Sequence, residues 1–494
     1  MANRGEIALR IFRACRDLGI ETVAVFSDAD RAAPHVAAAD YAIRLGPAPA
    51  RESYLSVPKI LEAAKKTGAR LIHPGYGFLA ENADFARACE QAGLRFVGPP
   101  SRAIEAMGSK TEARRRMQEA GVPIVPGLTR PAANARELAG FAAESGYPIL
   151  LKASAGGGGK GMRRVDGEKE LAPAFERVSS EAQVFFGDAA VYAEKLIEKP
   201  RHVEVQVVGD ARGNLLAVGE RECSLQRRHQ KVVEECPSPV VDAALRERLS
   251  SAAVTAARAV DYRSCGTVEF LLASDGSFFF LEMNTRLQVE HPLTEEVWGV
   301  DLASEMIRIA LGEPLSFKSE LLSPRGHAIE CRIYAEDPRR GFAPSPGRIE
   351  ALRLPEGPGV RNDVGVESGS VVPIDYDPML GKLIVHARDR SAAVSRLARA
   401  LSEYEVAGVE TTIPLFRRLV ADREFRDARF DVQWLDRRLA GGLLTDPDTT
   451  PEDAVLAAIA LAQSSAQPVC GDSAGQSSLW RSTARRESLR GDSS

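Results

Sequence analysis

Five features are scarce or missing in this 494-residue sequence. No apolar run approaches the roughly 18 residues that a membrane-spanning helix requires, and the N-terminus has no signal-peptide pattern. Net charge is small: 64 Lys and Arg against 68 Asp and Glu give −4, which argues against a nucleic-acid or membrane surface. The seven cysteines form no C-x-x-C pair. We therefore expect a reduced, cytoplasmic protein, and no internal repeat is evident.

The chain has the length and apolar content of a large multidomain protein. Its composition of 44% hydrophobic and 27% charged residues is ordinary, and 494 residues suffice for about three domains. In the first hundred residues, helical patterns at 7–18 and 55–66 alternate with strand patterns at 22–26 and 70–73, which predicts a parallel sheet. Only four residues precede the first helix, so an opening strand is missing or very short.

Residues 265–290 are the most informative segment. Two apolar, aromatic-rich stretches flank Asp275-Gly276, a dipeptide that favours a two-residue hairpin turn. Counting back residue for residue from that turn places Glu269 opposite Glu282. Directly opposite side chains have Cβ atoms roughly 5 Å apart, where two carboxylates repel each other unless a cation lies between them. The register therefore predicts a Mg²⁺ site on the hairpin.

A polar face follows the second carboxylate. Every second residue is polar, in the order Glu282, Asn284, Arg286, Gln288 and Glu290. A solvated strand face is one interpretation, but such faces favour Lys, Thr and Ser rather than this series beside a metal pair. If the segment is extended, Glu290 lies up to roughly 26 Å from Glu282. We therefore expect Glu290 to act on a different substrate atom and not to bind the same metal ion.

A glycine-rich run occupies residues 152–162. It contains G-x-G-x-x-G, but strand patterns flank it on both sides, whereas a dinucleotide-binding loop leads from a strand into a helix. Gly161 stands where a Walker A loop has Ser or Thr after the lysine. A surface hairpin is the alternative. Because Lys152 and Lys160 bracket the glycines, we expect backbone N–H groups here to close over phosphates.

A basic cluster spans residues 221–231. Such a stretch is usually a solvated face, and it gains a chemical role only if it faces the acidic hairpin. His73 and His202, taken singly, are more often structural than catalytic.

Six motifs occur in order along the chain. They are Ala-Asn-Arg-Gly-Glu-Ile-Ala at 2–8, His-Pro-Gly-Tyr-Gly-Phe-Leu at 73–79, the glycine run, Arg-His-Val-Glu-Val-Gln at 201–206, Gln-Arg-Arg-His-Gln-Lys-Val at 226–232 and Glu-Met-Asn-Thr-Arg-Leu-Gln-Val-Glu-His at 282–291. Together they resemble the motifs of biotin carboxylases, the ATP-grasp subunits or domains of biotin-dependent carboxylases. The resemblance extends from residue 2 to about residue 439.

The resemblance implies a multidomain fold of the α/β and α+β classes. A Rossmann-like N-terminal domain would span 1–108, and an ATP-grasp domain would span 109–320 with a mobile glycine-rich lid at about 128–200. A C-terminal biotin carboxylase domain would follow at 321–439. Residues 440–494 are expected to hold an Ala-rich helix at 451–463 and a disordered tail. Family members usually have an apolar strand before Ala2, and its lack puts the first sheet in doubt.

Carried over residue by residue, the resemblance also implies the site. The ATP contacts fall on Lys110, Lys152, Gly158, Gly159, Glu194, Lys195, Ile197, His202, Gln226, His229, Glu269 and Glu282. The ligands of Mg²⁺ or Mn²⁺ fall on Glu269, Glu282 and Asn284, and the bicarbonate pocket on Lys231, Arg286, Gln288, Val289 and Glu290. Biotin would contact Tyr76 and Arg332, and the catalytic set is Glu290, Arg286, Lys231 and Arg332.

The implied reaction is the ATP-dependent carboxylation of biotin by bicarbonate, through carboxyphosphate, as the first half-reaction of an acetyl-CoA or other acyl-CoA carboxylase. No methionine precedes a lysine, so the biotinylation sequence Met-Lys-Met is absent. Biotin carboxyl carrier protein and carboxyltransferase are therefore expected as separate partners of a homodimer. Trp480-Arg481 and the run at 485–490 resemble the linker before the carrier domain in acyl-CoA carboxylase α subunits.

Two other functions compete with this one. Another ATP-grasp ligase, such as half of a carbamoyl-phosphate synthetase, also activates bicarbonate but gives no reason for the segment around Arg332. A nucleotide-binding scaffold without turnover is suggested only by the missing strand, and the complete set of pocket residues argues against it.

Overall fold

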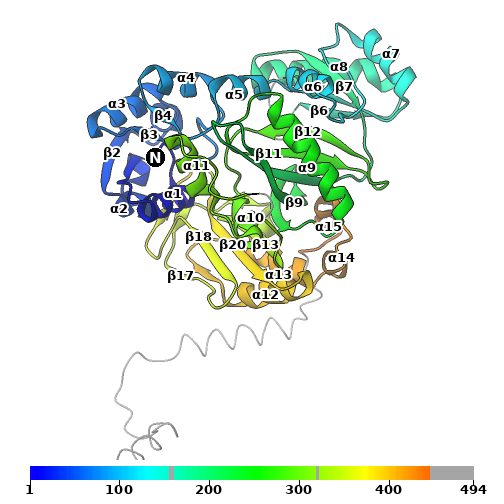
Figure 1. Ribbon diagram of the computed structural model, residues 1–494. Coiled ribbons are helices and arrows are strands. Elements are labelled where there is room, and N and C mark those ends of the chain that lie inside the picture. The colour runs from blue at the N-terminus through cyan, green and yellow to red at the C-terminus, as the bar shows by residue number, and fades with distance from the viewer. Residues whose placement is uncertain (155–160, 319–321, 445–494) are drawn as a thin grey trace, which may run out of the picture. The chain divides into compact units, whose positions relative to one another are not determined.

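The N-terminal part of the fold alternates helices with short parallel strands, as the sequence pattern predicts. The computed structural model describes residues 1–154, 161–318 and 322–444, and Met1–Leu444 form one compact unit (Figure 1). The strands of this part are β1 (Val23–Ser27), β2 (Tyr41–Gly46), β3 (Leu71–Ile72) and β4 (Arg95–Phe96). The helices are α1 (Gly5–Asp17), α2 (Pro34–Ala38), α3 (Val57–Thr67), α4 (Ala83–Gln91) and α5 (Ser101–Gly108), with 3-10 turns η1 (Asp28–Asp30) and η2 (Ala50–Glu52).

The described residues before α1 are not in a strand, and the strands of this region form two separate sheets. Strand β1 pairs in parallel with β2, and β3 pairs in parallel with β4. Between the two pairs, the Met1 ammonium group donates to the Val23 carbonyl at 2.8 Å and the Ala2 N–H donates to the His73 carbonyl at 2.9 Å. The backbone nitrogens of the first two residues thus donate one hydrogen bond toward each neighbouring pair.

A small antiparallel sheet surrounds the glycine-rich run. Its strand order is β6-β5-β7, with β5 (Ile149–Ala153), β6 (Met162–Val165) and β7 (Val191–Lys195). This confirms the strand patterns on both sides of the run. The glycines themselves, at 156–159, lie outside the described residues. The helices of this region are α6 (Lys110–Glu119), α7 (Ala135–Ser145) and α8 (Glu168–Phe186).

One eight-stranded antiparallel sheet runs through the rest of the fold. Its order is β12-β11-β8-β9-β10-β13-β20-β18. The strands are β8 (Arg201–Gly209), β9 (Leu215–Arg227), β10 (Gln230–Cys236), β11 (Ser264–Leu272), β12 (Phe278–Asn284), β13 (His327–Tyr334), β18 (Val360–Val364) and β20 (Met379–Ala387). Because β10 pairs with β13, the segment that holds Arg332 lies beside the basic cluster, although about a hundred residues separate them in sequence.

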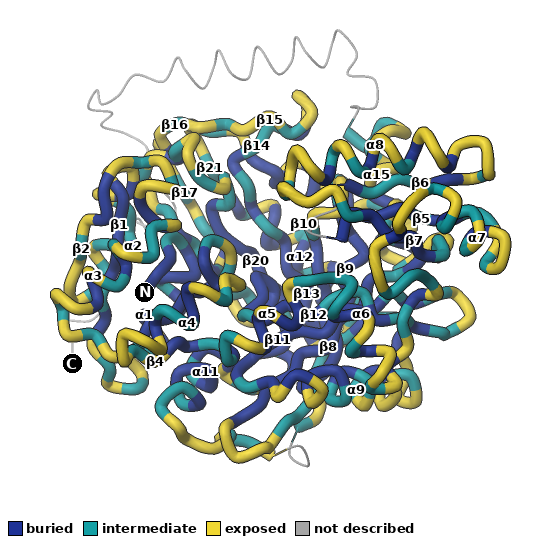
Figure 2. Tube along the Cα trace, turned by 90° about the horizontal axis from the view of Figure 1, so that it is seen from above, coloured by how far each residue is buried: buried dark blue, intermediate teal, exposed yellow. Residues whose placement is uncertain are grey.

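Helices pack along this sheet and bury most of its strands. Figure 2 shows the strands around β8, β11 and β13 as buried tube, with exposed residues on the outer helices. Alternate residues of each strand enter the apolar cores, such as Ile329, Cys331 and Ile333 of β13. The helices are α9 (Ala243–Arg258), α10 (His291–Trp298), α11 (Leu302–Leu311), α12 (Arg390–Glu403), α13 (Ile413–Ala421), α14 (Arg423–Arg426) and α15 (Trp434–Ala440).

Short strands and one 3-10 turn complete the described chain. They are β14 (Glu336–Asp337), η4 (Pro338–Arg340), β15 (Ala343–Pro344), β16 (Gly347–Arg348), β17 (Ala351–Arg353), β19 (Val371–Val372) and β21 (Glu405–Ala407). Among the described residues, no helix is long and apolar enough to cross a membrane. The expected Ala-rich helix at 451–463 lies outside the described residues.

The β11–β12 hairpin has the predicted carboxylate pair but not the predicted turn. Ala273 and Ser277 close a three-residue loop in which Gly276 has a φ of +80°, so the two-residue turn is wrong. This loop shifts the pairing by one residue, but an irregularity between Glu269 and Phe270 shifts it back. Glu269 and Glu282 are therefore cross-strand partners, as predicted.

Candidate active site

A cavity of about 620 Å³ opens where the large sheet, the small sheet and the N-terminal region meet. Its lining includes most of the residues that the sequence motifs single out. These are Tyr76, Lys110, Lys152, Glu194, Lys195, Ile197, His202, Gln226, His229, Lys231, Glu269, Glu282, Asn284, Arg286, Gln288, Val289 and Arg332. The basic cluster therefore does face the acidic hairpin.

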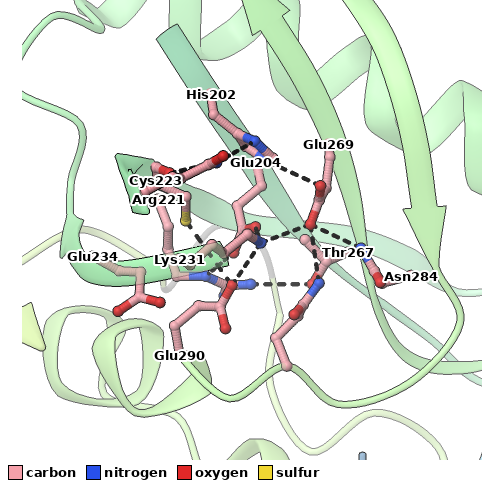
Figure 3. A network of polar contacts seen from close by, with 12 residues as sticks. His202, Glu204, Arg221, Cys223, Lys231, Glu234, Thr267, Glu269, Asn284 and Glu290 are labelled. Atoms are coloured by element: carbon pink, nitrogen blue, oxygen red, sulfur yellow. Dashed lines mark hydrogen bonds and ion pairs between the residues drawn. The ribbon is translucent and has the colours of Figure 1, made fainter. Parts of the chain in front are cut away.

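Lys231 lies among three carboxylates at one end of this cavity (Figure 3). Its Nζ donates to Glu204 Oε2 at 2.5 Å, to Glu269 Oε1 at 2.7 Å and to Glu290 Oε1 at 2.8 Å. Burial alone would lower the pKa of Lys231, but the three carboxylates outweigh it and hold that pKa well above its ordinary value. Lys231 is therefore a fixed cation in the site.

Glu269 is the most heavily contacted of these carboxylates. Its Oε1 also accepts hydrogen bonds from Asn284 Nδ2 at 2.8 Å and from Gln288 Nε2 at 3.2 Å. His202 Nε2 lies 2.9 Å from Oε2. Although burial would raise the pKa of Glu269, the charges of Lys231 and His202 lower it, so the group is a carboxylate.

Glu282, opposite, has no such partners. Among the described residues it makes no hydrogen bond or ion pair, while burial and the charge of Glu269 raise its pKa. An unpaired carboxylate beside a second carboxylate and the amide oxygen of Asn284 is a donor set of oxygens only. Hard cations such as Mg²⁺ prefer such ligands. The residues present therefore fit the metal that the hairpin register predicts.

Glu290 links Lys231 to Arg332. Glu290 is fully buried at the N-cap of α10, and its Oε2 accepts from Arg332 NH2 at 3.0 Å while its Oε1 accepts from Lys231. Burial alone would raise the pKa of Glu290, but these two cations hold it well below its ordinary value. Arg332 also donates through Nε to Glu234 Oε1 at 2.6 Å.

The other end of the cavity carries two lysines and a buried ion pair. Lys152 Nζ donates to Glu194 Oε2 at 2.5 Å, and Arg114 NH1 donates to Glu194 Oε1 at 2.7 Å. Lys110, the first residue of α6, has a lowered pKa, because it is buried and lies near Lys152. These cations suit a polyphosphate.

Comparison with known proteins gives matches along almost the whole described chain. Residues 1–104 match the family described as Biotin carboxylase, N-terminal domain. Residues 109–318 match Carbamoyl-phosphate synthase L chain, ATP binding domain, and residues 330–437 match Biotin carboxylase C-terminal domain.

Individual relatives agree with these matches. A pyruvate carboxylase subunit from Methanothermobacter thermautotrophicus is 51% identical over 442 residues, or 89% of this chain and 90% of that protein. Biotin carboxylase of Halalkalibacterium halodurans is 52% identical over 420 residues, or 85% and 93%. The chain belongs to the biotin carboxylase family. It is an ATP-dependent ligase with biotin carboxylase activity.

A solved biotin carboxylase structure shows the same fold. It is the biotin carboxylase domain dimer of the Hydrogenobacter thermophilus 2-oxoglutarate carboxylase, in complex with MgADP, ADP and bicarbonate. The TM-score is 0.86 at 45% identity, over 90% of this chain and 98% of that chain. The biotin carboxylase domains on both sides of residues 109–318 exclude half of a carbamoyl-phosphate synthetase, and the ligase activity excludes a scaffold without turnover.

Two predictions for the biotin carboxylase site need correction or fall outside the described residues. The segment after Glu282 is not extended, because β12 ends at Asn284 and the chain turns into α10. Glu290 therefore lies near Glu269, because Lys231 donates a hydrogen bond to both carboxylates. Gly158 and Gly159, predicted to contact ATP, lie outside the described residues.

His229 reaches the biotin carboxylase cavity through an unusual turn. Arg228 and His229, between β9 and β10, have φ values of +50° and +66°, which non-glycine residues seldom adopt. Such backbone conformations are often found at functional sites. The turn presents the His229 side chain to the cavity.

The sequence motifs did not identify two groups of residues in the site. The first group forms ion pairs that hold charged side chains in place: Arg221 donates to Glu204 at 2.5 Å, and Glu81 accepts from Arg286 at 2.9 Å. The second is apolar lining, namely Leu150, Met162, Tyr192, Leu196, Leu271 and Leu281. In the sequence these apolar residues look like ordinary core positions. Arg221 and Glu204 are fully buried charges, which the strand pattern around them could have flagged.

Proposed function

We propose that this biotin carboxylase carboxylates biotin on a carrier protein, as the first half-reaction of an acetyl-CoA or other acyl-CoA carboxylase. The observation that carries the proposal is the position of Glu290 between Lys231 and Arg332. One carboxylate thereby adjoins both a cation suited to bicarbonate and a cation suited to the ureido oxygen of biotin. Such an arrangement serves two successive reactions in one site.

In the first reaction, bicarbonate would lie against Lys231, Arg286, Gln288 and the backbone of Val289. Glu290 accepts its proton while a bicarbonate oxygen attacks the γ-phosphorus of ATP and ADP leaves as carboxyphosphate forms. Glu290 has a low pKa and is a weak base at rest. Its proton transfer is therefore concerted with the attack, which makes the bicarbonate proton more acidic.

ATP would occupy the other end of the cavity. Lys110 and Lys152 would neutralise its phosphates, Glu194, Lys195, Ile197, His202, Gln226 and His229 would surround the nucleotide, and the glycine run with Gly158 and Gly159 would close over it. Mg²⁺ held by Glu269, Glu282 and Asn284 would neutralise the charge of the migrating phosphoryl group.

In the second reaction, carboxyphosphate breaks down to CO₂ and phosphate. Phosphate takes the N1′ proton of biotin, and the ureido nitrogen then attacks CO₂ to give carboxybiotin. Arg332 would stabilise the ureido oxyanion by a charge-assisted hydrogen bond, with Tyr76 on the biotin side. Tyr76 donates to Glu6, which fixes its ring near that position.

We further propose domain boundaries at 1–108, 109–320 with a lid at about 128–200, and 321–439, followed by a tail. A cytoplasmic homodimer with carrier and carboxyltransferase partners completes the proposal. The resemblance of 480–490 to a linker in acyl-CoA carboxylases supports the acyl-CoA acceptor, whereas two of the relatives are named for pyruvate and 2-oxoglutarate.

Two assays test the proposal. Purified protein should release ADP only when bicarbonate is present, and it should form carboxybiotin from free biotin. An equal rate of ADP release with and without bicarbonate would refute the reaction. The complex isolated from the native cells should then carboxylate an acyl-CoA. Carboxylation of pyruvate or 2-oxoglutarate instead would refute the acceptor and leave the half-reaction intact.

A further inference from the structure

Two buried glutamates lie opposite each other behind Arg332. Glu234 on β10 and Glu330 on β13 are cross-strand partners, and both are 0% exposed. Both side chains lie on the face of the sheet opposite the core that holds Val233 and Cys331. Directly opposite side chains approach to roughly 5 Å between Cβ atoms, a distance at which two carboxylates repel.

The two carboxyl groups differ in their partners. Glu234 Oε1 accepts from Arg332, whereas Glu234 Oε2 and both oxygens of Glu330 have no hydrogen-bond partner among the described residues. A buried carboxylate without a partner is far more costly than a buried neutral carboxyl group. Because only Glu234 has a hydrogen-bond partner, we expect Glu234 to be ionised and Glu330 to be uncharged.

The charged groups around the pair also favour an uncharged Glu330. The titratable and charged groups near the pair are Lys231, Glu290, Arg332, Lys382, Tyr76, Tyr334, Cys223 and Cys331. Lys382 donates to the Val289 carbonyl at 2.8 Å and lies 3.3 Å from Glu6, so it is engaged elsewhere. Burial raises the pKa of Glu330 well above its ordinary value, and the cations nearby do not cancel this effect.

We propose that Glu234 and Glu330 share one proton, that Glu330 carries it, and that this uncharged Glu330 leaves Arg332 available to the ureido oxygen of biotin. The inference rests on the proposed role of Arg332. Arg332 already faces the carboxylates of Glu234 and Glu290. A third carboxylate two residues away on the same strand face would compete with the ureido oxyanion for the guanidinium group. Glu330 is thus a positioning residue that acts through Arg332.

The shared proton has two measurable consequences. Infrared difference spectroscopy in H₂O and D₂O should show the C=O band of a protonated carboxyl group at neutral pH, and Glu330→Gln should remove it. The matched control is Glu235→Gln, an adjacent buried glutamate with its own partners, His327 and Arg390, and this change should leave the band in place.

The kinetic consequence concerns alkaline pH. As pH rises, loss of the shared proton should lower the ratio of carboxybiotin to ADP in the wild-type enzyme, by about tenfold per pH unit above the pKa of the pair. In Glu330→Gln this ratio should not fall in the same range. If Glu330→Gln folds poorly, Glu330→Met supplies an uncharged side chain of similar size.

Two results would overturn the inference. One is the absence of a protonated-carboxyl band from the difference between the wild-type spectrum and the spectra of both Glu330 variants, and the other is an equal alkaline loss in the wild type and in the variants. Failure of the proposed function is distinguishable, because the wild-type enzyme would then form no carboxybiotin at any pH.

Discussion

Glu282 lies directly opposite Glu269 on adjacent strands, yet only Glu269 has cationic partners. Lys231 and His202 contact Glu269, whereas Glu282 makes no hydrogen bond or ion pair with any described residue. This asymmetry identifies Glu282 as the carboxylate with free capacity for a divalent cation.

Glu282→Gln should therefore weaken metal binding. We expect the Mg²⁺ concentration for half-maximal activity to rise by about tenfold or more, with weaker MgADP binding in calorimetry. The matched control is Glu247→Gln on α9, an exposed glutamate that should change neither quantity. An unchanged Mg²⁺ dependence in Glu282→Gln would remove this carboxylate from the metal site.

Bicarbonate binding should depend on the metal. Lys231 and Gln288, two proposed bicarbonate donors, both donate to Glu269 Oε1. A cation on Glu269 competes for that oxygen and frees both donors. We expect calorimetry to detect tighter bicarbonate binding with MgADP than with ADP and a chelator, and Glu269→Gln to abolish the difference. Equal bicarbonate affinity in both conditions would contradict this coupling.

Acid stability should depend on Glu235. Burial alone would raise its pKa, but the His327 hydrogen bond and the Arg390 charge lower it from 4.5 to about 2. A carboxylate whose pKa is lower in the folded state than in the unfolded state stabilises the fold at pH values above the unfolded pKa. This stabilisation is lost as pH falls toward the folded pKa. Glu235→Gln should therefore cost on the order of 3 kcal/mol near neutral pH, and the difference from wild type should shrink between pH 4.5 and about 2.

Urea denaturation at several pH values measures this effect. Glu367→Gln, an exposed glutamate, serves as the control and should follow the wild type throughout. A stability difference for Glu235→Gln that does not change with pH would mean that packing, and not charge, accounts for it.

The divided N-terminal sheet predicts a gain from an added strand. An engineered apolar strand ahead of Met1 could pair with β1 and β3 at once, because the first residues already contact Val23 and His73. Each buried apolar side chain would contribute roughly 1.5–3 kcal/mol, so the Tm should rise by several degrees. A scrambled polar extension of equal length is the control. An equal Tm with either extension would show that the gap needs no strand.

The sequence predicted the helix and strand order well, because buried faces repeat with clear periods. The pairing of Glu269 with Glu282 was also predicted, although by a count that assumed the wrong turn. The three-residue loop and the irregularity at Glu269 cancel, and no sequence period reveals either shift. The extended polar segment failed because alternation alone does not show that β12 stops at Asn284.

Contacts between segments far apart in the sequence were the part of the site that could not be predicted from the sequence. The pairing of β10 with β13 places Glu234 beside Glu330 and Arg332, and only tertiary structure specifies that register. Motif resemblance supplied Arg332 and its partner Glu290, but not its partner Glu234. Long-range strand pairing is set by packing against the whole sheet, which a local pattern does not contain.

Glu290 and Arg332 are proposed to act in successive reactions, and parallel measurement of ADP and carboxybiotin tests this order most directly. Glu290→Gln should abolish both products. Arg332→Gln should retain much of the bicarbonate-dependent ADP release while carboxybiotin formation loses roughly 3–4 kcal/mol of transition-state stabilisation. Equal loss of both products in the two variants, or coupled carboxylation retained in Arg332→Gln, would contradict the account.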